Sequence, residues 1–239
     1  GLISMLACTV YTLVSQSRVL PTYRNALVLS SMVTFIAGYH YWRIFDSFKD
    51  ASDGYMVATT GPDSFNEGYR YVDWLLTVPL LLVEVVAVLA LAKAASSSLI
   101  TRLVPASAAM IALGYPGEIS ADDGTKILWG VLSTIPFLYI LYVLFIELGK
   151  SLTKQSEAVQ RKVKLLRLLL IATWGVYPIT FILAMNSTGF NAAEFVNREV
   201  GYTIADVLAK CLFGLVIFSI ARIKSAEESA EFAKSEFKD

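Results

Sequence analysis

The chain has 239 residues, of which 17% are charged and 56% are hydrophobic, and its mean hydropathy is +0.59. A soluble domain carries about a quarter charged residues, so this composition indicates an integral membrane protein. The formal net charge is zero, which argues against nucleic acid as a partner. Both cysteines, Cys8 and Cys211, lie within apolar runs, which argues against a disulfide framework or a zinc site.

Seven apolar segments follow one another, each near the length of about 20 residues that spans a bilayer. They cover residues 1–18, 25–46, 68–92, 99–117, 125–149, 163–186 and 197–222. The pattern predicts an all-α membrane protein, a seven-transmembrane helix bundle over 1–224 followed by a charged cytoplasmic tail at 225–239. The link at 47–66 has turn residues at both ends and "GYMVATT" between them, which predicts a short β-hairpin between the second and third helices.

Lysine and arginine gather on one side of the predicted bundle. The link between the fifth and sixth segments and the start of the sixth carry "GKSLTKQSEAVQRKVKLLR", whereas the links on the other side are mostly acidic. Because cytoplasmic loops carry the excess of basic residues, we expect the N-terminus outside and the C-terminus in the cytoplasm.

The third segment, "RYVDWLLTVPLLLVEVV", contains Arg70, Asp73, Thr77 and Glu84. Eleven residues make almost three helical turns, so Asp73, Thr77 and Glu84 share one stripe, and the two acids lie about 16 Å apart along the axis. A charge in mid-membrane costs about 3 kcal/mol or more and usually marks a function. The stripe predicts two stations of a proton path. The alternative is a polar seam between helices, which Ser, Thr or Gly would make at lower cost.

The seventh segment, "GYTIADVLAK", places Asp206 and Lys210 one helical turn apart on one face. With Arg70 and Asp73 these residues form a set of four charges that sums to zero, as a low-dielectric interior demands. A buried lysine is readily deprotonated and suits Schiff-base chemistry. A purely structural ion-pair cluster would leave Glu84, alone on the inner side, unexplained.

Four motifs, "IAGYHYWRIF", "RYVDWLLTVPLLLVE", "ATWGVYP" and "GYTIADVLAK", resemble those of the microbial rhodopsins, and the likeness extends over all seven segments. It is strongest to the xanthorhodopsin and proteorhodopsin branch of light-driven proton pumps. The resemblance implies an outward proton pump rather than an enzyme, with all-trans retinal as cofactor. It also implies a bacterial inner (plasma) membrane, with lipid and protons as partners and a homo-oligomer, pentamer or trimer.

The resemblance also implies a role for each charged residue. Lys210 would bind retinal as a protonated Schiff base, with Asp73 as counterion and proton acceptor and Asp206 as second counterion. Glu84 would be the cytoplasmic proton donor. Thr77 completes the Asp-Thr-Glu triplet of outward proton pumps, which sodium and chloride pumps of the family replace.

His40 is the only histidine in the chain. In this branch the matching histidine bonds the acceptor carboxylate, so we expect His40 to pair with Asp73 and to tune its proton affinity. A histidine in a membrane helix is otherwise often a hydrogen-bonded core residue.

The resemblance implies an apolar retinal pocket, although aromatics at helical spacing are otherwise plain core. The matching residues are Trp74, Leu81, Met110, Gly114, Phe137, Trp174, Tyr177, Pro178 and Phe181. Leu81 matches a colour-tuning position and predicts green absorption. Gly130 matches a window that admits a carotenoid antenna, here expected to be a hydroxylated xanthophyll; close helix packing at a glycine is the alternative.

Two other functions remain open. A photosensory rhodopsin signalling to a partner usually lacks a carboxyl donor, so Glu84 argues against it. A lysine Schiff-base enzyme would turn over a soluble carbonyl substrate and have no visible chromophore.

The proton-release group is not assigned by the sequence: Glu118, Glu194 and Glu199 are acids on the outer side, and Glu199 is one residue out of step with the family position.

Overall fold

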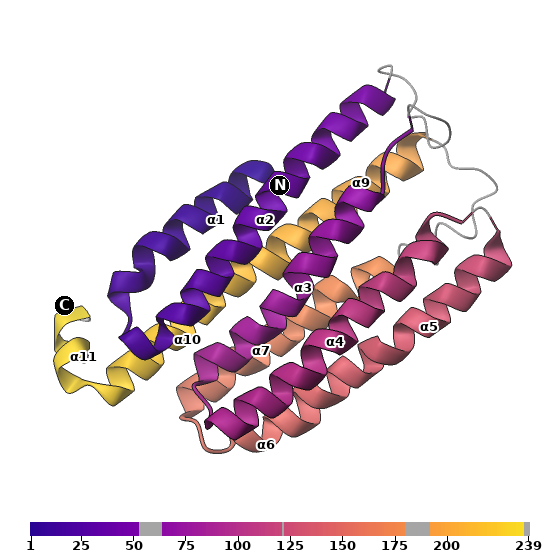
Figure 1. Cartoon of the computed structure of the whole chain (residues 1–239). Coiled ribbons are helices and arrows are strands. Elements are labelled where there is room, and N and C mark those ends of the chain that lie inside the picture. Colours follow the sequence, from indigo (N-terminus) through magenta and orange to yellow (C-terminus); the bar gives the residue numbers. More distant parts are fainter. Residues whose placement is uncertain (53–63, 121, 180–191, 237–239) are drawn as a thin grey trace.

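The computed structural model describes residues 1–52, 64–120, 122–179 and 192–236, with the backbone alone for 192–195. Within these ranges seven helical rods lie side by side in a bundle (Figure 1). Their bounds are α1 (Leu2–Val14) with the 3₁₀ turn η1 (Ser15–Arg18); α2 (Pro21–Ala51); α3 (Gly68–Leu89); α4 (Lys93–Glu118); α5 (Asp123–Tyr142), the π-helical η2 (Val143–Glu147) and α6 (Leu148–Leu152); α7 (Glu157–Trp174); and α9 (Ala192–Val207), the π-helical η3 (Leu208–Leu212) and α10 (Phe213–Glu228). A short α11 (Ala230–Glu236) follows.

Each predicted span falls on one rod, but several boundaries differ from the prediction. α4 begins at Lys93 and α7 at Glu157, each six residues before its predicted start, and the predicted end of the sixth span lies outside the described residues. The second helix starts earlier, at Pro21, whose fixed φ and missing N–H suit the first helical position, and it continues to Ala51. The first five residues of the predicted link at 47–66 are therefore helical. The predicted hairpin falls largely on 53–63, outside the described residues, and the elements of the described ranges include no strand.

The last rod also passes its predicted end. α10 continues to Glu228, and Ser225 is buried, its hydroxyl accepting a hydrogen bond from the backbone N–H of Leu20 at 2.9 Å. α11 then folds back, and Glu236 pairs with Arg18 and Arg222 at 3.4 Å each. The first residues of the charged tail thus pack against the bundle, because polar partners from the first, second and last rods meet there.

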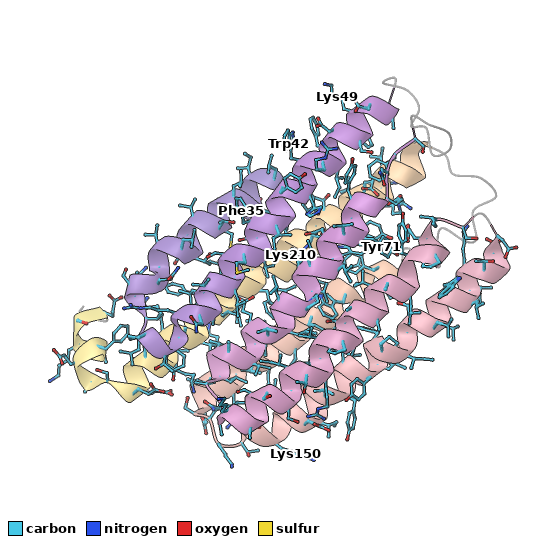
Figure 2. The ribbon with its side chains drawn as sticks, viewed as in Figure 1. Phe35, Trp42, Lys49, Tyr71, Lys150 and Lys210 are labelled. Carbon is cyan, nitrogen blue, oxygen red and sulfur yellow. The ribbon has the colours of Figure 1, made fainter. Side chains whose placement is uncertain are left out.

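Large apolar side chains cover much of the outside of the bundle, and several charged side chains lie inside it among the apolar residues of the core. Four helical stretches of the described residues are long and apolar enough to cross a membrane: Gly68–Leu89, Lys93–Glu118, Asp123–Leu152 and Val196–Glu228. Phe35 and Trp42 project outward from α2, whereas Lys210 lies in the interior (Figure 2). Arg70, Asp73, Thr77 and Glu84 are all fully or almost fully buried. The side of α3 that carries the predicted polar stripe therefore faces the bundle axis.

A π-helical turn carries Lys210. A π-turn inserts one extra residue into a helix and is frequent at functional sites. Here η3 lies between α9 and α10 and spans Leu208–Leu212. It places the lysine between α3 and the rest of its own rod, which sets up the contacts described next.

Candidate functional site

The amine of Lys210 lies between two carboxylates. Its side chain is 2% exposed, and Nζ donates to Asp73 Oδ2 at 2.7 Å and to Asp206 Oδ1 at 3.1 Å. Arg70 Nη1 lies 3.6 Å from Asp206 Oδ2. The four charges predicted to neutralise one another are thus assembled in one buried group, and an amine held this way is shielded from water.

Asp206 is held by donors from several rods. Tyr41 Oη donates to Oδ2 at 2.9 Å, while Tyr177 Oη and Trp74 Nε1 donate to Oδ1 at 2.7 and 3.3 Å. Hydrogen bonds to a carboxylate are strong and stabilise its charge. Asp206 is therefore a fixed anion in this site.

Asp73 is held much more loosely than Asp206. Lys210 bonds its Oδ2, but its buried Oδ1 has no hydrogen-bond partner among the described residues. Thr77 Oγ1 donates to the backbone carbonyl of Asp73 at 2.8 Å and not to its carboxylate. Asp73 thus combines contact with the amine and an oxygen free to take a proton, which distinguishes it from Asp206.

His40 lies on α2 and is buried. Its Nδ1 is 3.0 Å from the carbonyl oxygen of Ile36, and its ring meets that of Tyr39 edge-on at 5.2 Å. Nδ1 therefore donates to the helix, and only Nε2 remains to reach a second group. The described contacts include no hydrogen bond between His40 and Asp73, so their pairing stays a prediction.

Glu84 is isolated on the other side of Lys210. It is fully buried on α3, and neither carboxyl oxygen has a hydrogen-bond partner among the described residues. Ser30 Oγ lies beside it without making a hydrogen bond of normal geometry. Since an unpaired charge in apolar surroundings is very costly, Glu84 carries a proton in this state.

A cavity of about 150 Å³ reaches the Lys210 amine. Its wall contains the predicted Trp74, Leu81, Met110, Gly114, Gly130, Phe137, Trp174, Tyr177 and Pro178. The predicted Phe181 lies outside the described residues. The cavity is also lined by residues that the sequence analysis did not name: Tyr71, Val78, Ile111, Ser133, Thr134, Tyr202 and Ala209. Glu118, which it named only as an acid on the outer side, lines the cavity too. Tyr71 and Val78 lie at helical spacing from Trp74 and Leu81 on α3. The helical period of the sequence could therefore have predicted that they face the same cavity.

The cavity and its charges fit a long apolar aldehyde such as retinal. The buried Lys210 amine is the group that forms a Schiff base with a carbonyl. Asp73 and Asp206 would balance the charge of a protonated Schiff base, and the rings of Trp74 and Trp174 supply flat walls. The residues present therefore match the cofactor that the sequence resemblance implies.

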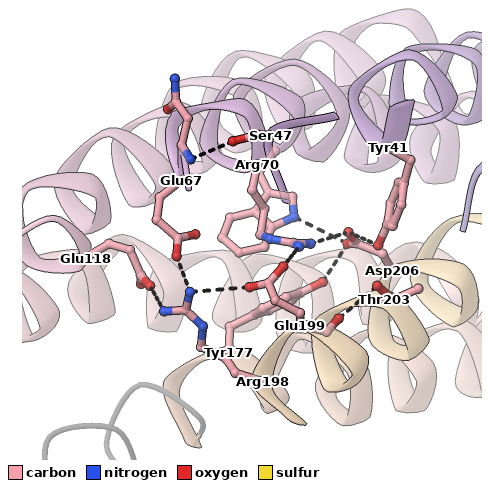
Figure 3. A network of polar contacts seen from close by, with 12 residues as sticks. Tyr41, Ser47, Glu67, Arg70, Glu118, Tyr177, Arg198, Glu199, Thr203 and Asp206 are labelled. Carbon is pink, nitrogen blue, oxygen red and sulfur yellow. Dashed lines mark hydrogen bonds and ion pairs between the residues drawn. The ribbon is translucent and has the colours of Figure 1, made fainter. Parts of the chain in front are cut away.

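A second polar cluster joins three rods at the end of the site nearest the start of α3 (Figure 3). Arg198 on α9 pairs with Glu67 and, through Nη1, with Glu118 Oε1 at 3.0 Å. Its Nη2 is 3.3 Å from Glu199 Oε1, and Glu199 also pairs with Arg70. The sequence analysis did not single out Glu67 or Arg198, because only the bundle brings the start of α3, the end of α4 and α9 together. The Glu194 side chain lies outside the described residues.

A buried lysine between two carboxylates, at an aromatic-lined cavity inside a helical bundle, defines the class of retinal-binding membrane proteins, the rhodopsins. The model of the bacteriorhodopsin-like protein family matches residues 1–224, and the chain belongs to this family.

Solved structures and curated relatives agree with that assignment. The crystal structure of thermophilic rhodopsin is 46% identical, with a TM-score of 0.89, over 95% of this chain and 92% of that one. Xanthorhodopsin, a light-driven ion pump with dual chromophore, is also 46% identical, with a TM-score of 0.87, over 95% of this chain and 91% of that one. A green-light absorbing proteorhodopsin of Gamma-proteobacterium EBAC31A08 is 31% identical over 224 residues, 91% of this chain and 82% of the relative.

These similarities confirm the resemblance seen in the sequence. The protein is a multi-pass membrane protein with the seven-helix fold of the rhodopsins, it belongs with the ion pumps of that family rather than with enzymes, and family membership implies retinal.

Proposed function

We propose that the protein is a light-driven outward proton pump that carries retinal on Lys210 as a protonated Schiff base. One observation carries the proposal: two buried carboxyls of α3 lie on opposite sides of Lys210 in contrasting surroundings. Asp73 touches the amine and has a second oxygen without a partner in the described part of the chain, while Glu84 is buried and has no hydrogen-bond partner there. This is the arrangement that a proton acceptor and a proton donor require.

When bound, retinal supplies light absorption and a change of geometry at the lysine nitrogen. The protein supplies the groups that receive and return the proton. Asp73 Oδ2 lies 2.7 Å from Nζ, within the hydrogen-bond reach that proton transfer needs. Asp206 stays ionised under its tyrosine and tryptophan donors and keeps a negative charge beside the nitrogen throughout.

Glu84 returns a proton to the Lys210 nitrogen from the other side. It lies about 16 Å from Asp73 along α3, on the side where basic residues gather, which we assign to the cytoplasm of a bacterial inner membrane. With the N-terminus outside, the order Glu84, Lys210, Asp73 moves a proton outward. Proton supply from one side and acceptance on the other give the direction.

The test is illumination of cells or vesicles that contain the retinal-loaded protein. We expect the medium outside intact cells to acidify in light, and a protonophore to abolish the effect. Lys210→Ala should form no visible absorption band and produce no acidification. A coloured protein that never acidifies the medium would overturn pumping and favour the photosensory alternative.

We further propose that a hydroxylated carotenoid binds at Gly130 as an antenna. Gly130 and Thr134 of α5 line the cavity, and Thr134 is exposed, so the cavity reaches the outer face of α5. The neighbouring Ile127, Val131 and Ile135 are 54 to 62% exposed and offer an apolar bed to a rod-shaped polyene. Xanthorhodopsin, the ion pump with dual chromophore, supports this proposal by similarity.

The antenna is tested by adding a xanthophyll to the retinal-loaded protein and recording the action spectrum of pumping. Carotenoid bands should appear in that spectrum and should vanish in Gly130→Trp, which fills the window. The same spectrum without carotenoid bands in the parent protein would contradict the antenna.

In the bilayer we propose a homo-oligomer of three or five copies, supported by similarity to the family. Native mass spectrometry in mild detergent reads the copy number directly, and a monomer would contradict it.

A further inference from the structure

Arg167 of α7 is a cation without an acidic partner among the described residues. Its Nε and Nη2 atoms are buried and have no hydrogen-bond partner in that part of the chain. Arg70, Arg198 and Arg222 also have buried nitrogens of this kind, but each of them forms an ion pair. Nε and Nη2 form the edge through which a guanidinium binds a carboxylate or a phosphate with two parallel hydrogen bonds. The edge of Arg167 that suits an oxyanion is therefore not used by the residues that the structure describes.

The guanidinium of Arg167 reaches from α7 to the neighbouring rod. It lies over the ring of Phe145 in η2, 5.2 Å from the ring centre. A carbon added to Gly149 of α6 would lie 3.7 Å from Nη2, so the guanidinium lies beside the last turn of that rod, which ends at Leu152. Glu147, the acid of the same turn region, pairs with Arg102 of α4 instead. The rod beside Arg167 thus supplies an aromatic face and no counter-charge.

Arg167 lies near the depth at which lipid headgroups begin. Trp174 lines the central cavity, and Arg167 lies seven residues before it, about 10 Å nearer the basic end of the bundle. Lys150, the residue after Gly149, lies at that same end (Figure 2). Half of the hydrocarbon core of a bilayer is about 15 Å thick, and a long arginine side chain extends toward the headgroups. The guanidinium is therefore within reach of a phosphate at the boundary of the bilayer.

The surroundings of Arg167 are basic at the end of the bundle and apolar toward its middle. Residues 148–167 contain six basic residues and one acid, Glu157. Of the six, only Arg161 has an acidic partner in the described ranges, Glu157 at 3.8 Å. Leu168 of α7 and Ile146 of η2 are 63 and 51% exposed. Basic pockets between transmembrane helices bind the headgroups of anionic lipids, and exposed apolar side chains beside such a pocket can contact the acyl chains.

We propose that Arg167 anchors one anionic phospholipid between α7 and the η2–α6 part of the neighbouring rod. Nε and Nη2 donate to two phosphate oxygens, and the acyl chains lie along Leu168 and Ile146. The side chain turns this edge toward the bilayer by rotation about its own bonds, since no hydrogen bond within the described part of the chain holds it. The excess of basic residues nearby favours an anionic lipid over a zwitterionic one. The lipid site does not depend on the proposed pumping.

The site is tested by native mass spectrometry of the retinal-loaded full chain, released from nanodiscs of mixed phosphatidylcholine and phosphatidylglycerol. We expect the parent to retain a phosphatidylglycerol molecule, and Arg167→Gln to bind it about tenfold more weakly or worse, with the visible band retained. Arg161→Gln is the matched control and should bind like the parent. It removes the same charge from the same helix, at a side chain that is 73% exposed and pairs with Glu157. Equal binding by the parent and Arg167→Gln would overturn the proposal.

A second variant covers the case in which Arg167→Gln does not fold and forms no visible band. Arg167→Lys keeps the charge but loses the two-bond edge, so it should bind phosphatidylglycerol more weakly than the parent does. Binding as tight as that of the parent would contradict the two-bond contact with phosphate.

The lipid is distinguished from a soluble anion by heating the protein in detergent. Added phosphatidylglycerol should raise the temperature at which the visible band is lost, because a ligand of the folded state stabilises it. The rise should occur in the parent and not in Arg167→Gln, and inorganic phosphate or phosphatidylcholine should not reproduce it. An equal rise with inorganic phosphate would assign the site to a soluble anion. An equal rise with phosphatidylcholine would remove the preference for anionic lipid, and either result would refute the proposal.

Discussion

Asp73 and Asp206 are identical side chains within reach of the same amine, yet their surroundings give them different tasks. Three neutral donors hold Asp206, whereas Asp73 has one oxygen on Lys210 and one without a partner among the described residues. A proton binds more easily to the carboxylate that gives up fewer hydrogen bonds when it is protonated. In the proposed pump, contact geometry therefore favours Asp73 over Asp206 as the acceptor, independently of its place in a sequence motif.

Asp73→Asn removes the acceptor and should lower light-driven acidification by about 100-fold or more, while Lys210 still forms its chromophore. Acidification of cell suspensions at equal pigment content measures the loss. Asp123→Asn serves as control and should pump like the parent protein. Pumping at more than a tenth of the parent rate in Asp73→Asn would assign the acceptor elsewhere.

Glu84→Gln removes the inner proton source without touching the Lys210 contacts. The late, reprotonating phase of the photocycle should slow by about 100-fold. The visible absorption should stay close to that of the parent, because neither carboxyl oxygen of Glu84 has a hydrogen-bond partner among the residues that the structure describes. Flash photolysis measures the phase. An unchanged rate would remove Glu84 from the proton path.

At the scale of elements, one arginine of α9 ties together the outer ends of α3 and α4. The tie uses Glu67 before α3 and Glu118 at the end of α4. The opposite ends are tied differently: Lys224 of α10 donates to Gln155 before α7 at 2.7 Å, and Glu236 of α11 pairs with Arg18. Rods that face lipid gain little from burying apolar surface against one another, so polar ties count for more.

Glu67 makes the stability of the folded protein depend on pH through its ion pair with Arg198. Its pKa is raised by burial to about 7 from 4.5, so between these values the folded protein keeps a proton that the unfolded chain has lost. The unfolded state then binds fewer protons, and stability falls as the pH rises through this window, by at most about 3 kcal/mol. The temperature at which the visible band is lost should therefore decrease with pH in the parent and change less in Glu67→Gln. A rise with pH would contradict the assignment.

At the scale of the molecule, the distribution of side chains suits a bundle that is surrounded by lipid and keeps water out of its interior. Large hydrophobic side chains of α1, α2 and α5 are exposed, while Arg70, Asp73, Glu84 and Lys210 are buried. The uneven distribution of Lys and Arg then sets which end faces the cytoplasm. In the proposed pump, that orientation decides whether the proton moves out of the cell or into it.

Orientation is measured by labelling single cysteines with a membrane-impermeant maleimide on intact cells. Asp123→Cys should react from outside, and Ala230→Cys should react only after the cells are opened. The native Cys8 and Cys211 are buried and should give little background. Labelling of Ala230→Cys on intact cells would reverse the proposed orientation and the direction of pumping.

The sequence by itself determined the membrane class, the spans and the charged residues of the site. Hydropathy fixes spans because backbone in lipid must bond within its own helix, and the period of a helix puts Asp73 and Glu84 on one face. Several helix boundaries differed. The start at Pro21 has a local signal, since proline suits the first helical position, whereas the packing of Ser225 depends on Leu20, a partner 205 positions away that no local pattern shows.

Tertiary structure alone decided which of the two aspartates has an oxygen without a partner among the described residues, and it brought Arg198 to Glu67 and Glu118. Those residues are 131 and 80 positions from Arg198 along the chain, so periodicity carries no information about their meeting. The helical period of the sequence likewise does not predict the π-turn at Lys210. Whether a carboxyl holds a proton depends on the charges within a few ångströms of it, and only the packing of the rods specifies those.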